Sequence, residues 1–98
     1  MVNLQFNKIV SIQESMVDAL YCSSVEAIQE LVGLGSSAMA LRAVEEFFDH
    51  PVAQSMERLS EPTWNSVPAE IRQEAIQKLQ DLVKQKSDAL RAMVTGEQ

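Results

Sequence analysis

Hydrophobic and polar positions follow a helical period along most of the chain. In residues 3–21, apolar side chains recur every three or four positions and form one stripe, which is typical of an amphipathic helix. The stripe consists of Phe6, Ile9, Ile12, Met16, Val17 and Leu20, with Gln13 as the one polar residue among them. We therefore predict a first helix that Asn3 can cap and that packs on a core through this stripe.

The apolar face of residues 25–48 changes sides partway along. The apolar residues of 25–39 share one side of a helix, whereas those of 40–49 lie on the other. A continuous helix would bury both faces, one against its own chain and one against a partner. Alternatively, the helix breaks at residues 33–37, where glycine can form a left-handed C-terminal cap and serine can cap the next helix. We favour the break, because two glycines and two serines coincide with the change of side.

Two further boundaries depend on short local patterns. Ser23 and Glu26 have the spacing of a capping box, which would start a new helix, but the apolar face continues past them as one long helix requires. Both structures stay open. Pro51 is expected to end the preceding helix, because the residue before a proline avoids the α conformation. The predicted helices are residues 3–21, 24–34, 37–49, 51–59 and 66–94, and an irregular connection containing Trp64 precedes the last of them.

The last helix is expected to end at Gly96. The spacing of Glu74 with Lys78 and of Asp88 with Arg91 predicts surface ion pairs on it. Lys86 occupies a position of its apolar seam and is expected to reach solvent or an acidic residue of another helix.

Composition indicates the fold class. Of the 98 residues, 46% are hydrophobic and only five are aromatic, and Gly and Pro number three each, so that few turns are available. We predict one all-α domain over residues 1–98, a bundle of three long or four to five shorter helices. The last helix would span on the order of 40 Å at about 1.5 Å per residue. Because only a long helix or a second copy of the chain can cover such a seam, we expect dimerisation to complete the bundle.

The net charge of −6 is concentrated in residues 1–62, which hold nine acidic residues against three basic ones. This acidity disfavours direct binding to nucleic acids and is typical of a solvated surface, although an acidic face could also bind a basic partner or imitate DNA. No basic and apolar leader and no bilayer-spanning apolar run is evident. Cys22 is the one cysteine, which fits a reducing compartment, so we expect a cytoplasmic protein with an inert, buried Cys22.

Chemical motifs are weak. Glu46 and His50 are four positions apart and would share one side of a helix, as two metal ligands require, but His50 is the one histidine and no second ligand pair is apparent. We therefore predict a protein that is not an enzyme and that has no catalytic residues, cofactor or metal. A small metal-dependent enzyme that uses Glu46 and His50 is the least favoured alternative.

The leading hypothesis is a protein–protein interaction module, such as an adaptor, a small chaperone or an inhibitor of a larger assembly, that buries apolar helix faces. Its expected partner is a second copy of the chain or a larger protein, with no membrane span. The predicted contact residues are Leu31, Met39, Leu41, Phe47, Phe48 and Trp64. Phe47 and Phe48 point about 100° apart on a helix, so both are buried only if two surfaces cover them. Trp64 can instead close one end of the bundle.

Two alternative functions accompany this hypothesis. The amphipathic helices, which carry Gln and Ala, resemble those of phasins in general composition, and phasins coat storage granules. That resemblance involves no motif and implies an amphipathic coat of lipid or granule surfaces. The other alternative is an acidic inhibitor that imitates DNA.

Overall fold

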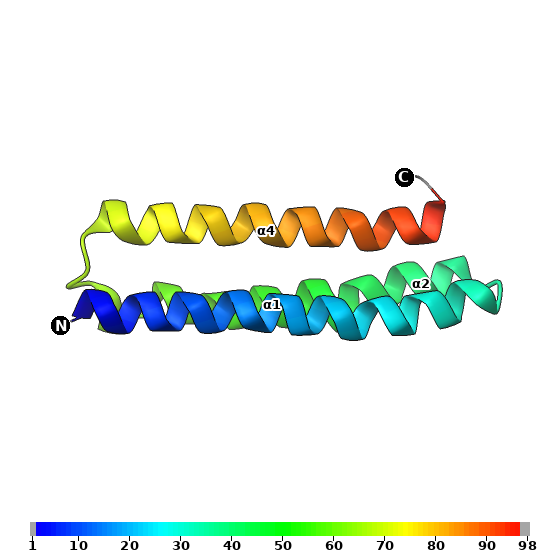
Figure 1. The fold of residues 1–98 in the computed structure, drawn as a ribbon, viewed down its shortest axis with the longest axis horizontal. Coiled ribbons are helices and arrows are strands. Elements are labelled where there is room, and N and C mark those ends of the chain that lie inside the picture. Colours follow the sequence, from blue (N-terminus) through cyan, green and yellow to red (C-terminus); the bar gives the residue numbers. More distant parts are fainter. Residues whose placement is uncertain (1, 97–98) are drawn as a thin grey trace.

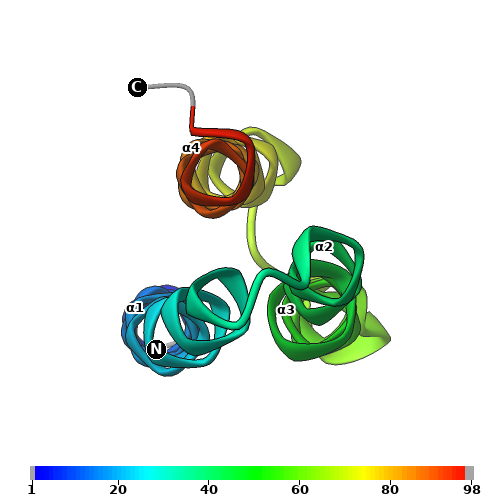
Figure 2. The same cartoon turned by 90° about the vertical axis from the view of Figure 1, so that its right-hand side faces the viewer.

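The structure is a computed structural model that describes residues 2–96. These residues are almost entirely helical, contain no strand and form three rods packed side by side (Figure 1). Seen along its length, the bundle has one rod at each corner of a triangle (Figure 2). The all-α prediction is therefore confirmed.

The rods follow the order of the chain. The first is α1 (Val2–Gly33), and the second consists of α2 (Ser37–Val44), the π-helical turn η1 (Glu45–Asp49) and α3 (His50–Met56). Two 3₁₀ turns, η2 (Glu57–Ser60) and η3 (Pro62–Trp64), lead to the third rod, α4 (Ala69–Thr95). The second rod runs opposite to the other two (Figure 1).

The first helix does not stop at Ser23. α1 continues to Gly33, so Ser23 lies on an exposed face inside the helix. Val17 and Ile28, on either side of the candidate boundary, are both fully buried in one core cluster. The shared apolar face thus outweighs the local capping pattern. Asn3 also lies inside α1, which begins at Val2, and is therefore not its N-cap.

The predicted break at residues 33–37 is confirmed. Gly35 has a φ of 77°, and its N–H donates to the carbonyl of Val32 at 2.9 Å, while the N–H of Ser36 donates to the carbonyl of Leu31 at 3.0 Å. These two bonds form a Schellman cap, in which a left-handed residue, usually glycine, ends the helix. Ser36 is the N-cap of α2 by position, but its side chain makes no capping hydrogen bond.

The predicted helix end at Pro51 is wrong. Pro51 lies in the first turn of α3, and the rod stays helical on both sides of it. A proline lacks an N–H and would interrupt the α-helical bonding one turn earlier. The π turn η1 occupies that turn, and the N–H of His50 donates to the carbonyl of Glu45, five residues back. A local change in helix winding therefore accommodates the proline without a loop.

The start of α4 is later than predicted. Pro68 is its N-cap with an extended ψ of 135°, so residues 66–68 belong to the connection. At the other end, Gly96 has a φ of 76° and follows the last helical residue, as predicted. The exposed pair of Glu74 and Lys78 also forms, with 3.6 Å between the carboxylate and the ammonium.

The core has two clusters, one at each half of the bundle. The larger consists of Val17, Ile28, Ala40, Ala43, Val44, Phe48, Val52 and Leu90. The smaller consists of Phe6, Leu59, Val67 and Leu79. All three rods contribute to the larger cluster, which holds them together by burial of aliphatic surface.

The apolar stripe of α1 faces the core as predicted, except at Ile12. Ile12 is 55% exposed, whereas the polar Gln13 is only 2% exposed. The amide nitrogen of Gln13 donates to the hydroxyl of Ser55 at 2.9 Å, and that hydroxyl donates to the carbonyl of Val52 at 3.0 Å. Because Gln13 finds this partner on α3, its burial costs less than burial of an unpaired amide would.

Polar contacts attach α4 to the other two rods. The hydroxyl of Ser87 donates to Asp49 at 2.8 Å, and Arg91 forms an ion pair with the same carboxylate, instead of the predicted pair with Asp88. Lys86, for which we expected an acidic neighbour or solvent, lies over the ring of Tyr21, 4.6 Å from its centre. Among the helices of residues 2–96, none has the length and apolar composition that a bilayer-spanning segment needs.

Candidate protein-interaction surface

A shallow groove of about 160 Å³ lies between the end of α1 and the segment formed by α2 and η1. We call it the Phe47 groove. It is lined by Leu31, Met39, Arg42, Ala43, Glu46 and Phe47. No residue of α4 contributes to it, so the third rod leaves this face of the bundle uncovered.

Two large apolar side chains in this groove are accessible. Met39 is 59% exposed and Phe47 is 51% exposed, although both lie on elements whose other faces are buried. The buried residues of α2, which face the core, are Ala40, Ala43 and Val44. Met39 lies on the adjacent side of the helix. At 51% exposure, about 100 Å² of the Phe47 side chain is accessible, and covering it with a partner would contribute roughly 2.5 kcal/mol to binding.

Phe47 and Phe48 have opposite environments. Phe48 is fully buried in the larger core cluster, whereas Phe47 is half exposed. Adjacent helical residues cannot both face one core, so the chain covers only one of them. Phe48 is therefore not available as a contact residue, contrary to its place in the predicted set, and Phe47 is.

The groove carries one charge of each sign. Arg42 and Glu46 are both exposed and line the groove together with Phe47. Although they are four residues apart, no ion pair involves either of them within residues 2–96, where the recorded pairs join Lys78 to Glu74 and Arg91 to Asp49. Both charged groups are thus free to meet groups from outside the chain.

The other predicted contact residues are dispersed. Leu31 is partly buried and forms the α1 side of the groove. Leu41 is 37% exposed on α2 but does not line the groove. The most exposed large apolar residue in the described chain, Leu34 at 78%, was not predicted. Its position between two glycines in the turn was a usable signal, since an apolar residue there has no helix face on which to be buried.

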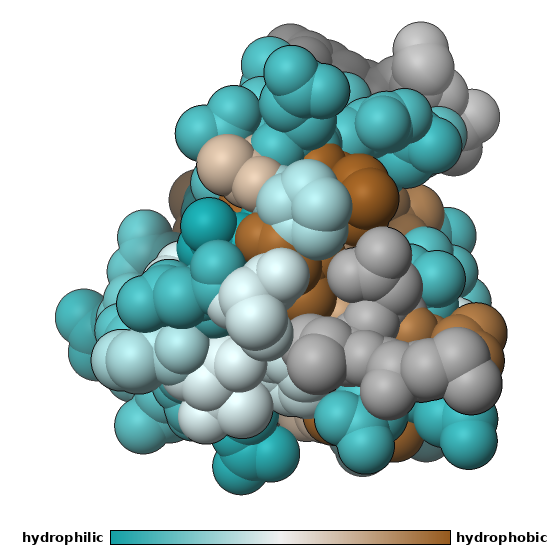
Figure 3. Space-filling model, turned by 90° about the vertical axis from the view of Figure 1, so that its left-hand side faces the viewer, coloured by the Kyte–Doolittle hydropathy of each residue, from teal (hydrophilic) through white to brown (hydrophobic). Residues whose placement is uncertain are grey.

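Trp64 lies at the opposite end of the bundle and closes it. Its ring meets that of Phe6 edge-on, with 5.6 Å between ring centres and 65° between ring planes. Its indole N–H donates to the carbonyl of Arg58 at 3.1 Å. In the view onto this end, some apolar side chains are visible between the polar ones at the rim (Figure 3). Trp64 thus has the predicted structural role of a lid, and its partner-binding role stays a prediction.

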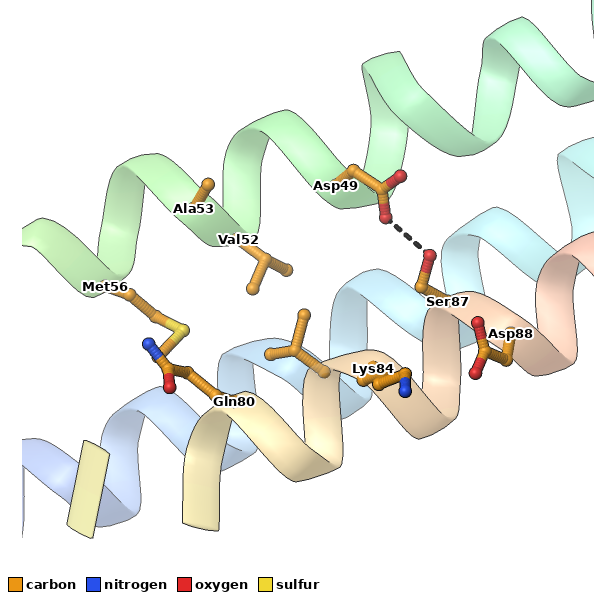
Figure 4. Close-up of a pocket in the computed structure, with 9 residues that line it drawn as sticks. Asp49, Val52, Ala53, Met56, Gln80, Lys84, Ser87 and Asp88 are labelled. Atoms are coloured by element: carbon orange, nitrogen blue, oxygen red, sulfur yellow. Dashed lines mark hydrogen bonds between the residues drawn. The ribbon is translucent and has the colours of Figure 1, made fainter. Parts of the chain in front are cut away.

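A larger groove of about 470 Å³ lies between α3 and α4 (Figure 4). Val52, Met56 and Val83 contribute apolar side chains to it, and Asp49 is at one end. Val52 is buried, and Met56 and Val83 are partly buried. The Asp49 carboxylate is bonded to Ser87 and Arg91. The Phe47 groove has two large apolar side chains that are each more than half exposed, and this larger groove has none, so we regard the Phe47 groove as the better candidate for binding.

The residues considered for chemistry do not converge. His50 is exposed at the start of α3, and Glu46 lies in the Phe47 groove. Within residues 2–96 no three His, Cys, Asp or Glu side chains are grouped as a metal site would need. Cys22 is exposed on α1, so the expectation of a buried cysteine is wrong.

In comparisons with known proteins, no family model matches the chain, and no curated protein or solved structure matches it. Function is therefore inferred from the chemistry of the surface.

Proposed function

We propose that this chain is a non-enzymatic protein–protein interaction module that binds a protein partner through the Phe47 groove. The observation that carries this proposal is the exposure of Met39 and Phe47, at 59% and 51%, in one groove between two helices. A bound helix would place its apolar residues over these side chains and its polar residues over the rim.

The composition of the groove supports a protein as partner. Exposed aromatic and Met side chains with an Arg at the rim are enriched where proteins bind one another. The charges of Arg42 and Glu46 cancel, so the groove itself has no net attraction for a polyanion. The module would act as an adaptor, a small chaperone or an inhibitor of a larger assembly in the cytoplasm. A second copy of the chain or a larger protein would be its partner.

Photocrosslinking in the cell that makes the protein tests this proposal. A photoreactive phenylalanine analogue at position 47 should form a covalent adduct with a protein. The matched control is the same analogue at position 85, because Gln85 is exposed on α4 and lines none of the grooves described above. The mass of the adduct distinguishes a second copy from another protein. Equal or absent protein adducts at the two positions would contradict the proposal.

A substitution provides a second test. Phe47→Asp should abolish the partner adduct of a photoreactive group placed at Met39, because a carboxylate in the groove would have to be desolvated on binding. Helicity by circular dichroism should stay near that of the unsubstituted chain, since Phe47 is half exposed. A loss of helicity would instead assign Phe47 to the intramolecular core.

A further inference from the structure

We infer that the Phe47 groove binds a second copy of this chain, docked antiparallel across a two-fold axis near Ala43, with Arg42 of each copy paired to Glu46 of the other. This inference rests on the proposed function, because it names the partner of the same groove. Three features of the described residues carry it.

The first feature is the charge pattern. Arg42 and Glu46 lie on either side of Ala43 along the segment, and neither has an ion-pair partner within residues 2–96. In a two-fold interface, residue i of one copy meets residue j of the other, and j meets i. Antiparallel docking about a point between positions 42 and 46 therefore creates two identical Arg–Glu pairs. A groove with two charges of one sign could not satisfy itself in this way.

The second feature is the apolar pattern, whose midpoint, Ala43, is one residue before Val44, the midpoint of Arg42 and Glu46. Met39 and Phe47 are each four residues from Ala43, one before it and one after it. The same antiparallel docking places the Met39 thioether of one copy near the Phe47 ring of the other. Sulfur–aromatic contacts of this kind are favourable. The two most exposed apolar side chains of the groove would then cover each other.

The third feature is the residue at the centre. Ala43 is 4% exposed and lines the groove between the two pairs. Packed helix axes approach to about 8–10 Å, and the approach depends on the side chains at the crossing point. Because the Ala43 methyl group packs into its own core, no side chain projects from the floor of the groove at this point, so the flanking charged and apolar side chains can reach the other copy.

Charge reversal with light scattering after size exclusion tests the inference. The unsubstituted chain should have twice its mass of 10.9 kDa. Arg42→Glu and Glu46→Arg should each raise the dimer dissociation constant by about tenfold or more, because each places like charges opposite each other twice. The double variant R42E/E46R should recover the dimer, as should an equimolar mixture of the two single variants. The matched control Arg58→Glu reverses an exposed arginine outside the groove and should leave the dimer unchanged.

The contrary outcomes are distinct. A dimer that is unaffected by the single reversals, or a double variant as weak as the singles, would overturn the reciprocal pairing. A mass of 10.9 kDa at all concentrations would overturn self-association. In that case an adduct at position 47 with a different protein would still support the proposed function, whereas absence of any protein adduct there would remove both. Circular dichroism of each variant verifies that it is folded.

Discussion

Phe6 and Phe47 are both phenylalanines on amphipathic rods, yet one is covered and the other is not. Phe6 is fully buried, and Trp64 lies edge-on against it. Phe47 is 51% exposed, with no segment of the described chain over it. The difference lies in what each ring faces. Phe6 packs with Trp64 and Val67 from the segment that leads to α4, whereas Phe47 lies on a side of its rod that the core around Phe48 does not cover.

This contrast separates side chains that stabilise the fold from those that are available for binding. Burial against the chain itself contributes to folding, and burial against another molecule contributes to association. The cluster around Phe6 and Trp64 is closed, although Leu4 and Ile12 on the outer side of α1 are 56% and 55% exposed, whereas Met39 and Phe47 line an apolar groove.

The largest expected difference comes from truncating the two phenylalanines. Phe6→Ala should lower the free energy of unfolding by about 3–5 kcal/mol, since it leaves a cavity under Trp64. Phe47→Ala should cost about 1 kcal/mol or less when the chain is kept dilute enough to be monomeric. Urea denaturation followed by circular dichroism measures both. Similar losses for the two variants would contradict the distinction between a closed and an open region.

Removing the Trp64 side chain should expose Phe6 to solvent, as Phe47 already is. Trp64→Ala uncovers Phe6 and deletes the hydrogen bond to the Arg58 carbonyl, so we expect a loss of about 2 kcal/mol. Trp64→Phe keeps the ring contact and loses only the hydrogen bond, and should cost about half as much. If Trp64→Ala left the denaturation midpoint unchanged, Trp64 would be free to act as a partner anchor instead.

The attachment of α4 should contribute less. Asp49→Ala removes the contacts to Ser87 and Arg91 and should cost about 1–2 kcal/mol, a modest amount because these side chains are partly exposed to solvent. Asp88→Ala is the control, since Asp88 was the expected partner of Arg91 but makes no ion pair within residues 2–96. Equal effects of the two substitutions in chemical denaturation would argue against the Asp49 pair.

The smallest expected effect concerns the short connection between α1 and α2. Gly35→Ala should cost about 1 kcal/mol, because an alanine is strained at a φ of 77°. Gly33→Ala is the matched control, since Gly33 is helical and a methyl group there would meet nothing within 4 Å, so it should be neutral or stabilising. The melting temperatures of the two variants test this, and a reversed order would contradict the Schellman cap at Gly35.

Features that depend on a few neighbouring residues could be predicted from the sequence. The helical period indicated an all-α chain, and Gly35 and Gly96 marked helix ends because glycine readily adopts a positive φ. Glu74 and Lys78 could be paired from their spacing alone. Even so, Pro51 was misinterpreted, because a π turn can absorb a proline and no simple sequence signal predicts such a turn.

The sequence by itself therefore determined where the helices form and that each has an apolar face. Only the tertiary structure decided which residues of those faces are covered. It buried Gln13 rather than Ile12, covered Phe48 rather than Phe47, and paired Arg91 with Asp49. The physical reason is that helix formation depends on contacts within one or two turns, whereas burial depends on how each rod is rotated toward segments some 40 residues away, such as Ser55 for Gln13, at a sequence separation of 42.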